Sequence, residues 1–261
     1  MRDCSPIDTV NQHAWRRIGT VSTYGSDPNL QLPERLILEA IGPEVRGQGI
    51  LDLGVGTGRT TPHLMLLSRD YIGIDYSPEM LACCRARFPG ADLQLGDARD
   101  LSKFPTGRFG LVFFSYNGID YVGHDDRLQI LRQIHRILKP QGVLAFSSHN
   151  RDTAMDGPRD LLKRGWAEHP VQVLRGLPAY LRMIVRHWRM AKHEVRTPAY
   201  AIVNDSSDDF SLLTYYIRLD DQVAQLLALR YCEVEAVSLA GRRIPVGAVD
   251  RSPWIHYIAR K

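Results

Sequence analysis

The sequence predicts an α/β fold built on a doubly wound, mostly parallel sheet. Between residues 49 and 150, short apolar runs that suit buried strands alternate with segments of helical spacing. A glycine-rich turn directly follows the first of these runs. The 261 residues are 44% hydrophobic and 24% charged, an ordinary composition for a globular protein. Strands that alternate with helices in this way are parallel and joined by right-handed crossovers.

The expected elements follow one another in a regular order. Five strands are expected in the alternating region, at residues 49–54, 71–75, 92–95, 109–115 and 142–148. Helices are expected between them, at residues 60–67, 78–88 and 125–138. Ser77 is placed to cap the second of these helices, and Pro78 suits its first turn. Outside the region we expect helices at 33–41 and 220–230, and strands at 232–239 and 254–259.

The alternation lapses after residue 150 and resumes late, so the chain divides into four parts. Residues 1–48 are expected to form an N-terminal helical cap, and residues 49–150 the α/β core. Residues 151–205 are expected to be a helical insertion after the fifth strand, which covers the substrate site as a lid. Residues 206–261 are expected to return to the core with the last strands.

The net charge is small and unevenly distributed. A formal charge of +4 and a pI near 8.9 fall short of what marks a dedicated nucleic-acid binder, so no nucleic-acid partner is expected. Residues 151–200 hold ten Lys or Arg against five Asp or Glu, whereas the rest of the chain is close to neutral. The positive excess therefore belongs to the insertion.

The cysteines and the N-terminus indicate a cellular compartment. Cys4, Cys83, Cys84 and Cys232 form no Cys-x-x-Cys pair, and no cluster of metal-ligating residues is evident. The N-terminus lacks the apolar core of a signal peptide, and no run approaches the roughly 18 apolar residues that a membrane span requires. We therefore expect a cytoplasmic protein with reduced thiols and no metal site.

The strongest functional signal is the segment 52–59, which lies between a buried strand and a helix. Its glycines are Gly54, Gly56 and Gly58. Glycines at alternate positions let the backbone turn tightly and approach a ligand, and the start of the following helix favours an anion. A nicotinamide-dinucleotide fingerprint would need a third glycine where this chain has Arg59. Asp52 suits a ligand with a cationic ammonium group instead, although a turn without any ligand is the simpler alternative.

Two further acids end the next two strands. Asp75 closes the second strand, where a carboxylate can accept both hydroxyls of a ribose. Asp97 follows the third strand, where it can accept from the exocyclic amine of an adenine. Either could be an ordinary loop aspartate. With Asp52 they mark the ends of three successive strands beside the glycine turn, so together they indicate a nucleoside site.

Several consecutive motifs resemble those of the class I S-adenosylmethionine (SAM)-dependent methyltransferases, most closely the small-molecule group that includes the quinone-biosynthesis enzymes. The motifs are DLGVGTGRTT, GIDYSPEML, LGDARDL, SYNGIDYV and LRQIHRILKPQGVLAFSSHN, within about residues 49–150. The resemblance implies a Rossmann-like sheet of seven strands with the last one antiparallel, SAM as cofactor and S-adenosylhomocysteine as product. The insertion at 151–205 departs from the family pattern, so the resemblance identifies no acceptor.

The resemblance also implies which residues hold SAM. Asp52 and the glycine turn would hold the methionine portion, and Asp75 the ribose. Asp97 and Ala98 would hold the adenine. The expected cofactor-binding residues are Asp52, Gly54, Gly56, Gly58, Asp75, Tyr76, Asp97, Ala98, Tyr116 and Asn117, of which the last two would line the methionine side.

Methyl transfer requires mainly that the acceptor be aligned and water excluded. A general base would help if the acceptor is a hydroxyl or an acidic carbon, and His149 is the candidate, because it lies just past the carboxyl end of the fifth strand. The alternative is that His149 only satisfies backbone groups at a turn. Tyr24 and Tyr216 are candidate acceptor-facing residues, with side-chain packing as the alternative for each.

The insertion contains an amphipathic pattern. Apolar residues recur at helical spacing, and basic residues fall largely on another side: Leu181, Ile184, Val185 and Trp188 against Arg182, Arg186, Arg189 and His193. Three interpretations remain open. The helix could be a lid with a solvated basic face, a basic face that binds an anionic acceptor, or a surface that docks peripherally on an anionic membrane to reach a lipidic acceptor.

The expected function is in-line transfer of a methyl group from SAM to a small-molecule acceptor. Methylation of a protein or RNA is an alternative, weakened by the absence of an aromatic-basic stacking pattern. It is also weakened because residues 115–118 read Ser-Tyr-Asn-Gly where an Asn-Pro-Pro-Tyr-type motif would stand. A SAM-binding protein without catalysis is a further alternative. The sequence determines neither the acceptor nor the oligomeric state.

Overall fold

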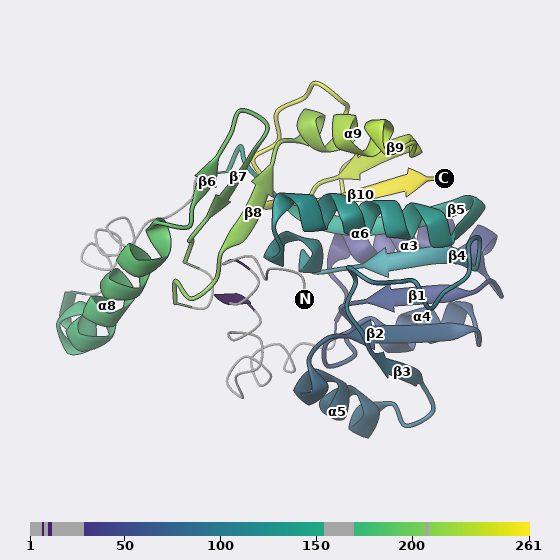
Figure 1. Cartoon of the computed structure of the whole chain (residues 1–261), viewed down its shortest axis with the longest axis horizontal. Helices are drawn as coiled ribbons and strands as arrows, with labels where there is room; N and C mark the ends of the chain where they lie inside the picture. The colour runs from purple at the N-terminus through teal and green to yellow at the C-terminus, as the bar shows by residue number, and fades with distance from the viewer. Residues whose placement is uncertain (1–6, 8–9, 12–28, 154–169, 207–208) are drawn as a thin grey trace.

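The computed structural model describes residues 7, 10–11, 29–153, 170–206 and 209–261. Its centre is one sheet, in which the first five strands lie in the order β3–β2–β1–β4–β5. These are β1 (Ile50–Leu53), β2 (Tyr71–Asp75), β3 (Asp92–Leu95), β4 (Phe109–Phe114) and β5 (Leu138–Asn150). Neighbours among them are parallel (Figure 1). The chain enters the sheet at β1 and adds strands on both sides, which confirms the doubly wound fold.

Two strands from the C-terminal part complete this sheet beyond β5. β10 (Trp254–Arg260) pairs antiparallel with β5, and β9 (Cys232–Val237) pairs antiparallel with β10. These seven strands, with the last one antiparallel, are as predicted, but the sheet as a whole has ten strands. The register places Trp254 opposite His149, so the start of β10 lies beside the carboxyl end of β5.

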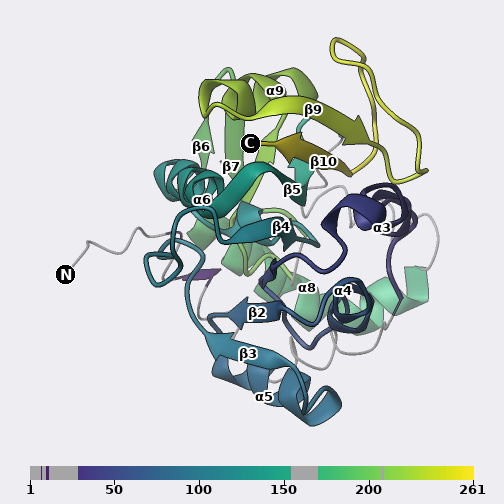
Figure 2. The ribbon, with the colours of Figure 1, turned by 90° about the vertical axis from the view of Figure 1, so that its right-hand side faces the viewer.

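Helices cover both faces of the sheet. α3 (Leu32–Val45), α4 (Thr61–Leu67) and α5 (Pro78–Arg87) bury apolar side chains on one face, and α6 (His124–Ile137) and α9 (Leu219–Ala228) on the other. Figure 2 shows α3 and α4 on one side of the strands and α6 on the other. Successive residues of a strand point to opposite faces of the sheet. Ile50 therefore belongs to the apolar cluster of α3, α4 and α5, and Leu51 to the cluster of α6 and α9. Coverage on both faces explains why the central strand β4 is continuously apolar.

The helix boundaries follow local signals. α5 begins behind Ser77, as predicted, and the Ser77 Oγ accepts a hydrogen bond from the Met80 N–H at 3.2 Å. α3 continues beyond the predicted residue 41 to Val45, although Pro43 lies inside it.

The segment after β5 contains strands as well as a helix. α8 (Pro170–Ala191) is the helix that the apolar spacing indicated, but three strands were not expected: β6 (Val195–Arg196), β7 (Tyr200–Val203) and β8 (Thr214–Ile217). β8 pairs in parallel with the last two residues of β5, and β7 and β6 follow antiparallel. Strands this short show no clear alternation in the sequence, and β8 depends on the end of β5, which extends beyond the predicted 142–148. The insertion is thus helical only in part, and the four-part division of the chain stays a prediction.

Candidate active site

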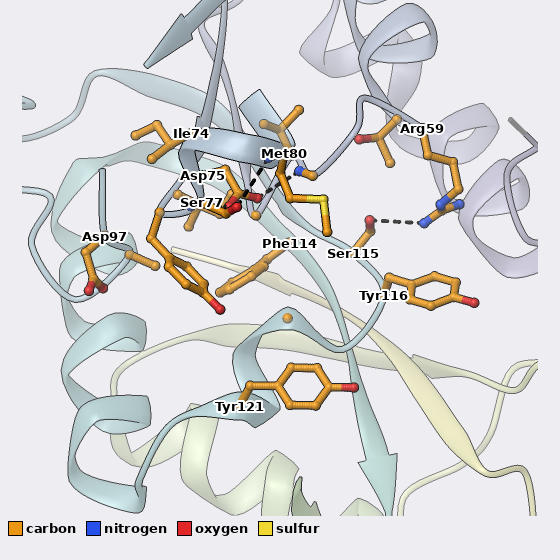
Figure 3. Close-up of a pocket in the computed structure, with 18 of the residues that line it drawn as sticks. Arg59, Ile74, Asp75, Ser77, Met80, Asp97, Phe114, Ser115, Tyr116 and Tyr121 are labelled. Atoms are coloured by element: carbon orange, nitrogen blue, oxygen red, sulfur yellow. Dashed lines mark hydrogen bonds between the residues drawn. The ribbon is translucent and has the colours of Figure 1, made fainter. Parts of the chain in front are cut away.

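A cavity of about 370 Å³ lies at the carboxyl ends of β1 to β4 (Figure 3). Open α/β sheets bind ligands at this edge, and the volume suits a small molecule. Seven of the ten predicted cofactor residues line the cavity: Gly54, Gly56, Asp75, Tyr76, Asp97, Ala98 and Tyr116. Asp52, Gly58 and Asn117 do not line it.

The glycine turn adopts backbone conformations that favour glycine. Gly54 and Gly56 have φ angles of +64° and +56°, and their backbone forms part of the cavity wall. Gly58, with φ of +90°, has a different reason to be glycine. A Cβ at Gly58 would lie 2.7 Å from both the Cys84 Sγ and a ring carbon of Phe88. Gly58 therefore permits close packing of the turn against α5 and makes no cavity wall.

Asp52 lies buried beneath the glycine turn. Its Oδ2 accepts hydrogen bonds from the Thr60 hydroxyl at 2.6 Å and the Tyr71 hydroxyl at 3.0 Å. Its Oδ1 has no hydrogen-bond partner within the described residues. Burial raises the pKa of the Asp52 carboxyl to about 7, against the weaker opposing effect of the two hydroxyl donors. Thr60 lines the cavity, so Asp52 lies one hydrogen bond away from it.

Asp75 joins the glycine turn to β2. Its Oδ2 accepts the Gly56 N–H and its Oδ1 accepts the Ser77 N–H, each at 2.8 Å. Burial raises the pKa of Asp75, and these backbone donors act in the opposite direction. The carboxylate still has lone pairs that face the cavity and can accept further hydrogen bonds.

Asp97 is held by a neighbouring arginine. The Arg99 Nη2 donates to the Asp97 Oδ2 at 2.6 Å, and the Arg99 Nη1 lies 3.3 Å from the Asp126 Oδ2. Arg99 lines the cavity beside Asp97, and this place of Arg99 in the site was not predicted. The pairing fixes the Asp97 carboxylate at the far end of the cavity from Arg59, as Figure 3 shows.

Arg59 is a second cavity residue that the sequence reasoning did not assign. Its guanidinium pairs with both oxygens of the buried Glu34 on α3, at 2.5 and 2.7 Å, and lies 5.0 Å from the Tyr116 ring centre. Burial acts to lower the pKa of Arg59, but the hydrogen bonds and charge of Glu34 outweigh it and raise that pKa. The signal in the sequence was an arginine at the position where a nicotinamide-dinucleotide fingerprint has its third glycine. Only the folded chain brings Glu34 into contact with this arginine.

The turn after β4 presents aromatic side chains to the cavity. Tyr116 and Asn117 both have left-handed φ angles, of 54° and 58°. Two such residues in succession are uncommon, and backbone strain of this kind clusters at functional sites. Tyr116 lines the cavity together with Tyr121 (Figure 3). Asn117 is buried behind the wall, where its N–H donates to the Ser147 Oγ at 2.8 Å.

His149 belongs to a buried hydrogen-bonded pair. Its Nδ1 lies 2.8 Å from the Asp120 Oδ2, which also accepts the His149 N–H at 2.6 Å. A proton on Nδ1 completes the side-chain hydrogen bond and leaves the lone pair on Nε2, 3.4 Å from the Asn117 Nδ2. His149 does not itself line the cavity, but its ring meets that of the cavity residue Tyr121 edge to face at 6.2 Å. Asp120 was not predicted, because its only signal in the sequence is a single acid in an apolar segment.

The two candidate acceptor tyrosines are placed differently. Tyr24 lies outside the described residues. Tyr216 does not line the cavity; its ring is 5.1 Å from that of His149, and its hydroxyl bonds to Asp205 at 2.5 Å. Burial, followed by the Asp205 charge, raises the pKa of Tyr216, so its hydroxyl stays protonated at neutral pH. On the other side of His149, the Trp254 ring lies at 6.1 Å.

Relatives in sequence identify the domain. Residues 50–142 match the family model of a methyltransferase domain. An uncharacterized methyltransferase of Synechocystis is 33% identical over 135 residues, which cover 52% of this chain and 60% of that protein. A demethylmenaquinone methyltransferase of Renibacterium salmoninarum is 31% identical over 119 residues, or 46% of this chain and 48% of that protein. The chain therefore matches less than two thirds of the length of either relative.

Solved structures share the fold. The 1,6-didemethyltoxoflavin-N1-methyltransferase of Burkholderia thailandensis, solved with its substrate and S-adenosylhomocysteine, aligns with a TM-score of 0.58 and 15% identity over 98% of this chain and 87% of that one. A SAM-dependent methyltransferase of Mesorhizobium loti aligns with a TM-score of 0.56 and 19% identity, over 88% and 98%. These structures thus share the Rossmann-like fold of this chain. Residues 50–142 thus form a methyltransferase domain, in agreement with the motifs that resemble those of the class I SAM-dependent methyltransferases.

Proposed function

We propose that this protein transfers a methyl group from SAM to a small-molecule acceptor. The observation that carries the proposal is the convergence of the glycine turn, Asp75 and Asp97 on one cavity. Bound SAM supplies an electrophilic methyl group, so the protein has mainly to bind, orient and exclude water. The names of two relatives, the demethylmenaquinone and the didemethyltoxoflavin methyltransferase, state small-molecule acceptors, which supports the same class here.

The described residues fit the chemistry of SAM. The Asp52 Oδ1, which has no partner in the part of the chain that the structure describes, would be satisfied by an ammonium group. Asp75 would accept the ribose hydroxyls, and Asp97 the adenine amine beside Tyr76 and Ala98. In this assignment Gly54, Gly56 and Tyr116 surround the methionine portion, whereas Gly58 and Asn117 act only by shaping the two turns.

We assign His149 the role of general base. Asp120 orients the ring so that the lone pair lies on Nε2, which is 3.4 Å from the Asn117 Nδ2, and the ring meets that of the cavity residue Tyr121 edge to face. His149 would take a proton from a hydroxyl or another acidic group of the acceptor. The acceptor atom that loses this proton would form a bond to the methyl carbon, and the sulfur would leave with the electron pair of the carbon–sulfur bond. A general base within hydrogen-bonding reach of the acceptor contributes about 10²–10⁴-fold.

Calorimetry tests the cofactor assignment. We expect S-adenosylhomocysteine to bind and a nicotinamide dinucleotide not to bind; the opposite pattern would refute the proposal. Asp75→Asn should weaken binding of S-adenosylhomocysteine, whereas Asp92→Asn, which changes an exposed acid on β3, should not.

Incubation with methyl-labelled SAM tests the acceptor class. We expect label in a pool of metabolites and none in pooled RNA or protein. Label confined to RNA or protein contradicts a small-molecule acceptor. Tight binding of S-adenosylhomocysteine without any transfer would favour a non-catalytic SAM-binding protein.

A further inference from the structure

The helix α8 exposes a continuous apolar stripe. Its members recur at helical spacing and all have exposed side chains: Leu177, Leu181, Ile184, Val185 and Trp188. Trp188 is 79% exposed, which is unusual for so large an apolar side chain. Contiguous apolar surface of this kind marks an interaction site in a soluble protein.

A different face attaches α8 to the rest of the molecule. The His187 Nδ1 bonds to the Asn204 Oδ1 at 2.9 Å, and the His187 ring contacts Phe210 at 5.2 Å. The Arg186 Nη1 donates to the Asp209 carbonyl at 2.9 Å. Within the described residues, no side chain of α8 lines the cavity. The stripe therefore faces away from the body, as expected from the way α8 stands apart from the sheet in Figure 1.

The charge of α8 has a single sign. Pro170–Ala191 contains four arginines and neither Asp nor Glu. Arg182 and Arg189 are exposed along one border of the stripe. Apolar side chains bordered by arginines are typical of helices that lie in the interface of an anionic bilayer. Two copies of this chain joined through the stripe would bring like charges together, which disfavours self-association.

We propose that α8 docks this protein on an anionic lipid surface, with the stripe among the acyl chains and the arginines at the headgroup phosphates. No helix in the described ranges, α8 included, is long and apolar enough to cross a membrane. In this proposal α8 therefore lies on the membrane surface. In Figure 1 the β4 arrow points toward the side where α8 lies. A bilayer at α8 would thus lie on the side of the sheet that holds the cavity.

Vesicle flotation of the full chain tests the charge component. We expect binding to phosphatidylcholine vesicles that contain phosphatidylglycerol, little binding to pure phosphatidylcholine, and a loss of binding with added salt. Arg182→Gln and Arg189→Gln should each weaken binding about fivefold. Arg132→Gln, which removes an exposed arginine from α6, is the matched control and should change nothing. Absence of binding to the acidic vesicles, or equal losses in all three variants, overturns the proposal.

A second pair of variants tests the apolar component. Leu181→Ser should reduce binding severalfold, whereas Leu227→Ser on α9 should not, although the two leucines are 53% and 54% exposed. Trp188→Phe should remove most of the fluorescence quenching by brominated lipids. If Leu181→Ser instead dissociates a dimer in sedimentation velocity while vesicles do not bind, the stripe joins two copies and the proposal is wrong. Affinity for S-adenosylhomocysteine in solution should be unchanged in all variants, so the outcome is independent of the proposed methyl transfer.

Discussion

Asp52 shows how much the surroundings of a single residue determine its chemistry. From its position before the glycine turn we expected a ligand-facing carboxylate, but the side chain is buried under that turn, and one of its oxygens has no partner among the described residues. Burial raises its pKa to about 7, so the proton is retained in neutral solution more than in any ordinary carboxyl. A cationic group nearby would reverse this shift.

The raised pKa of Asp52 makes stability depend on pH. Because the folded protein holds this proton more tightly than the unfolded chain, the Asp52 contribution to the free energy of unfolding falls as pH rises from about 4 to 7, by at most about 1.4 kcal/mol per pH unit. Burial lowers the pKa of His256 to about 4, which gives the opposite slope between about pH 4 and 6.5. The quantity to compare by urea unfolding is therefore the difference between wild type and Asp52→Asn. A difference that does not vary with pH contradicts the expectation.

The pair of His149 and Asp120 gives a prediction about turnover. His149→Ala should lower kcat by about 10²–10⁴-fold, because the imidazole accepts the proton of the acceptor. The affinity for S-adenosylhomocysteine should stay within about twofold of wild type, because the ring does not bind the cofactor. Asp120→Asn should lower kcat as well, since an amide cannot hold the same tautomer. His135→Ala on α6, which does not line the cavity, is the control. Unchanged turnover in His149→Ala would leave the residue a purely structural role.

At the scale of elements, the glycine turn serves two purposes with one motif. Gly54 and Gly56 bring backbone to the cavity, and Gly58 lets the turn pack on α5. The spacing alone predicted three ligand contacts. A sequence pattern does not distinguish a glycine that makes room for a ligand from a glycine that makes room for a neighbouring helix.

Three alanine substitutions separate these purposes. Gly107 has φ of +68° in open space, so Gly107→Ala should cost only the backbone strain, about 1–2 kcal/mol. Gly58→Ala should cost roughly 1–3 kcal/mol more, because the methyl group overlaps Cys84 and Phe88. Gly56→Ala should be comparable to Gly107→Ala in stability but should weaken binding of S-adenosylhomocysteine. Urea unfolding and calorimetry measure the two effects; equal losses of affinity at Gly56 and Gly58 would count against the distinction.

At the scale of the whole molecule, Arg127 connects elements that are distant in sequence. This fully buried guanidinium on α6 pairs with Asp120, donates to the Gln222 Oε1 of α9 at 2.6 Å, and lies 4.5 Å from the ring centre of Tyr215 on β8. It also reaches the Ser148 Oγ of β5 at 3.0 Å. The same network therefore supports Asp120, the candidate partner of His149, and the junction where β8 joins β5.

Removing this arginine should destabilise the whole fold. Arg127→Met is expected to cost about 3–5 kcal/mol, because it leaves the buried Asp120 without its arginine partner. Combining it with Asp120→Asn should recover part of the loss, which a double-mutant cycle measures. Arg108→Met, which breaks an exposed pair with Asp70, should cost no more than about 1 kcal/mol. Similar losses for the two arginines would contradict the assigned role.

Much of the sheet and part of the site could be predicted from short stretches of chain. β2 and β3 lie where their apolar runs placed them, and Asp75 and Asp97 end up at one cavity because parallel strands end at one edge. The three short strands after α8 could not be predicted, since their pairing needs the extended end of β5. Glu34 could not be assigned either, because its partner Arg59 is brought to it only when α3 packs on the sheet.

The sequence by itself determined the alternation of strands and helices, the glycine turn and the acids at the strand ends. These depend on local periodicity and on backbone conformations, which act over a few residues. Only the tertiary structure decided that Asp120 orients His149, that Arg127 meets Gln222 and that the stripe of α8 is exposed. These facts depend on contacts between residues far apart in the chain, 95 positions apart for Arg127 and Gln222, and on which face of a helix the body leaves uncovered.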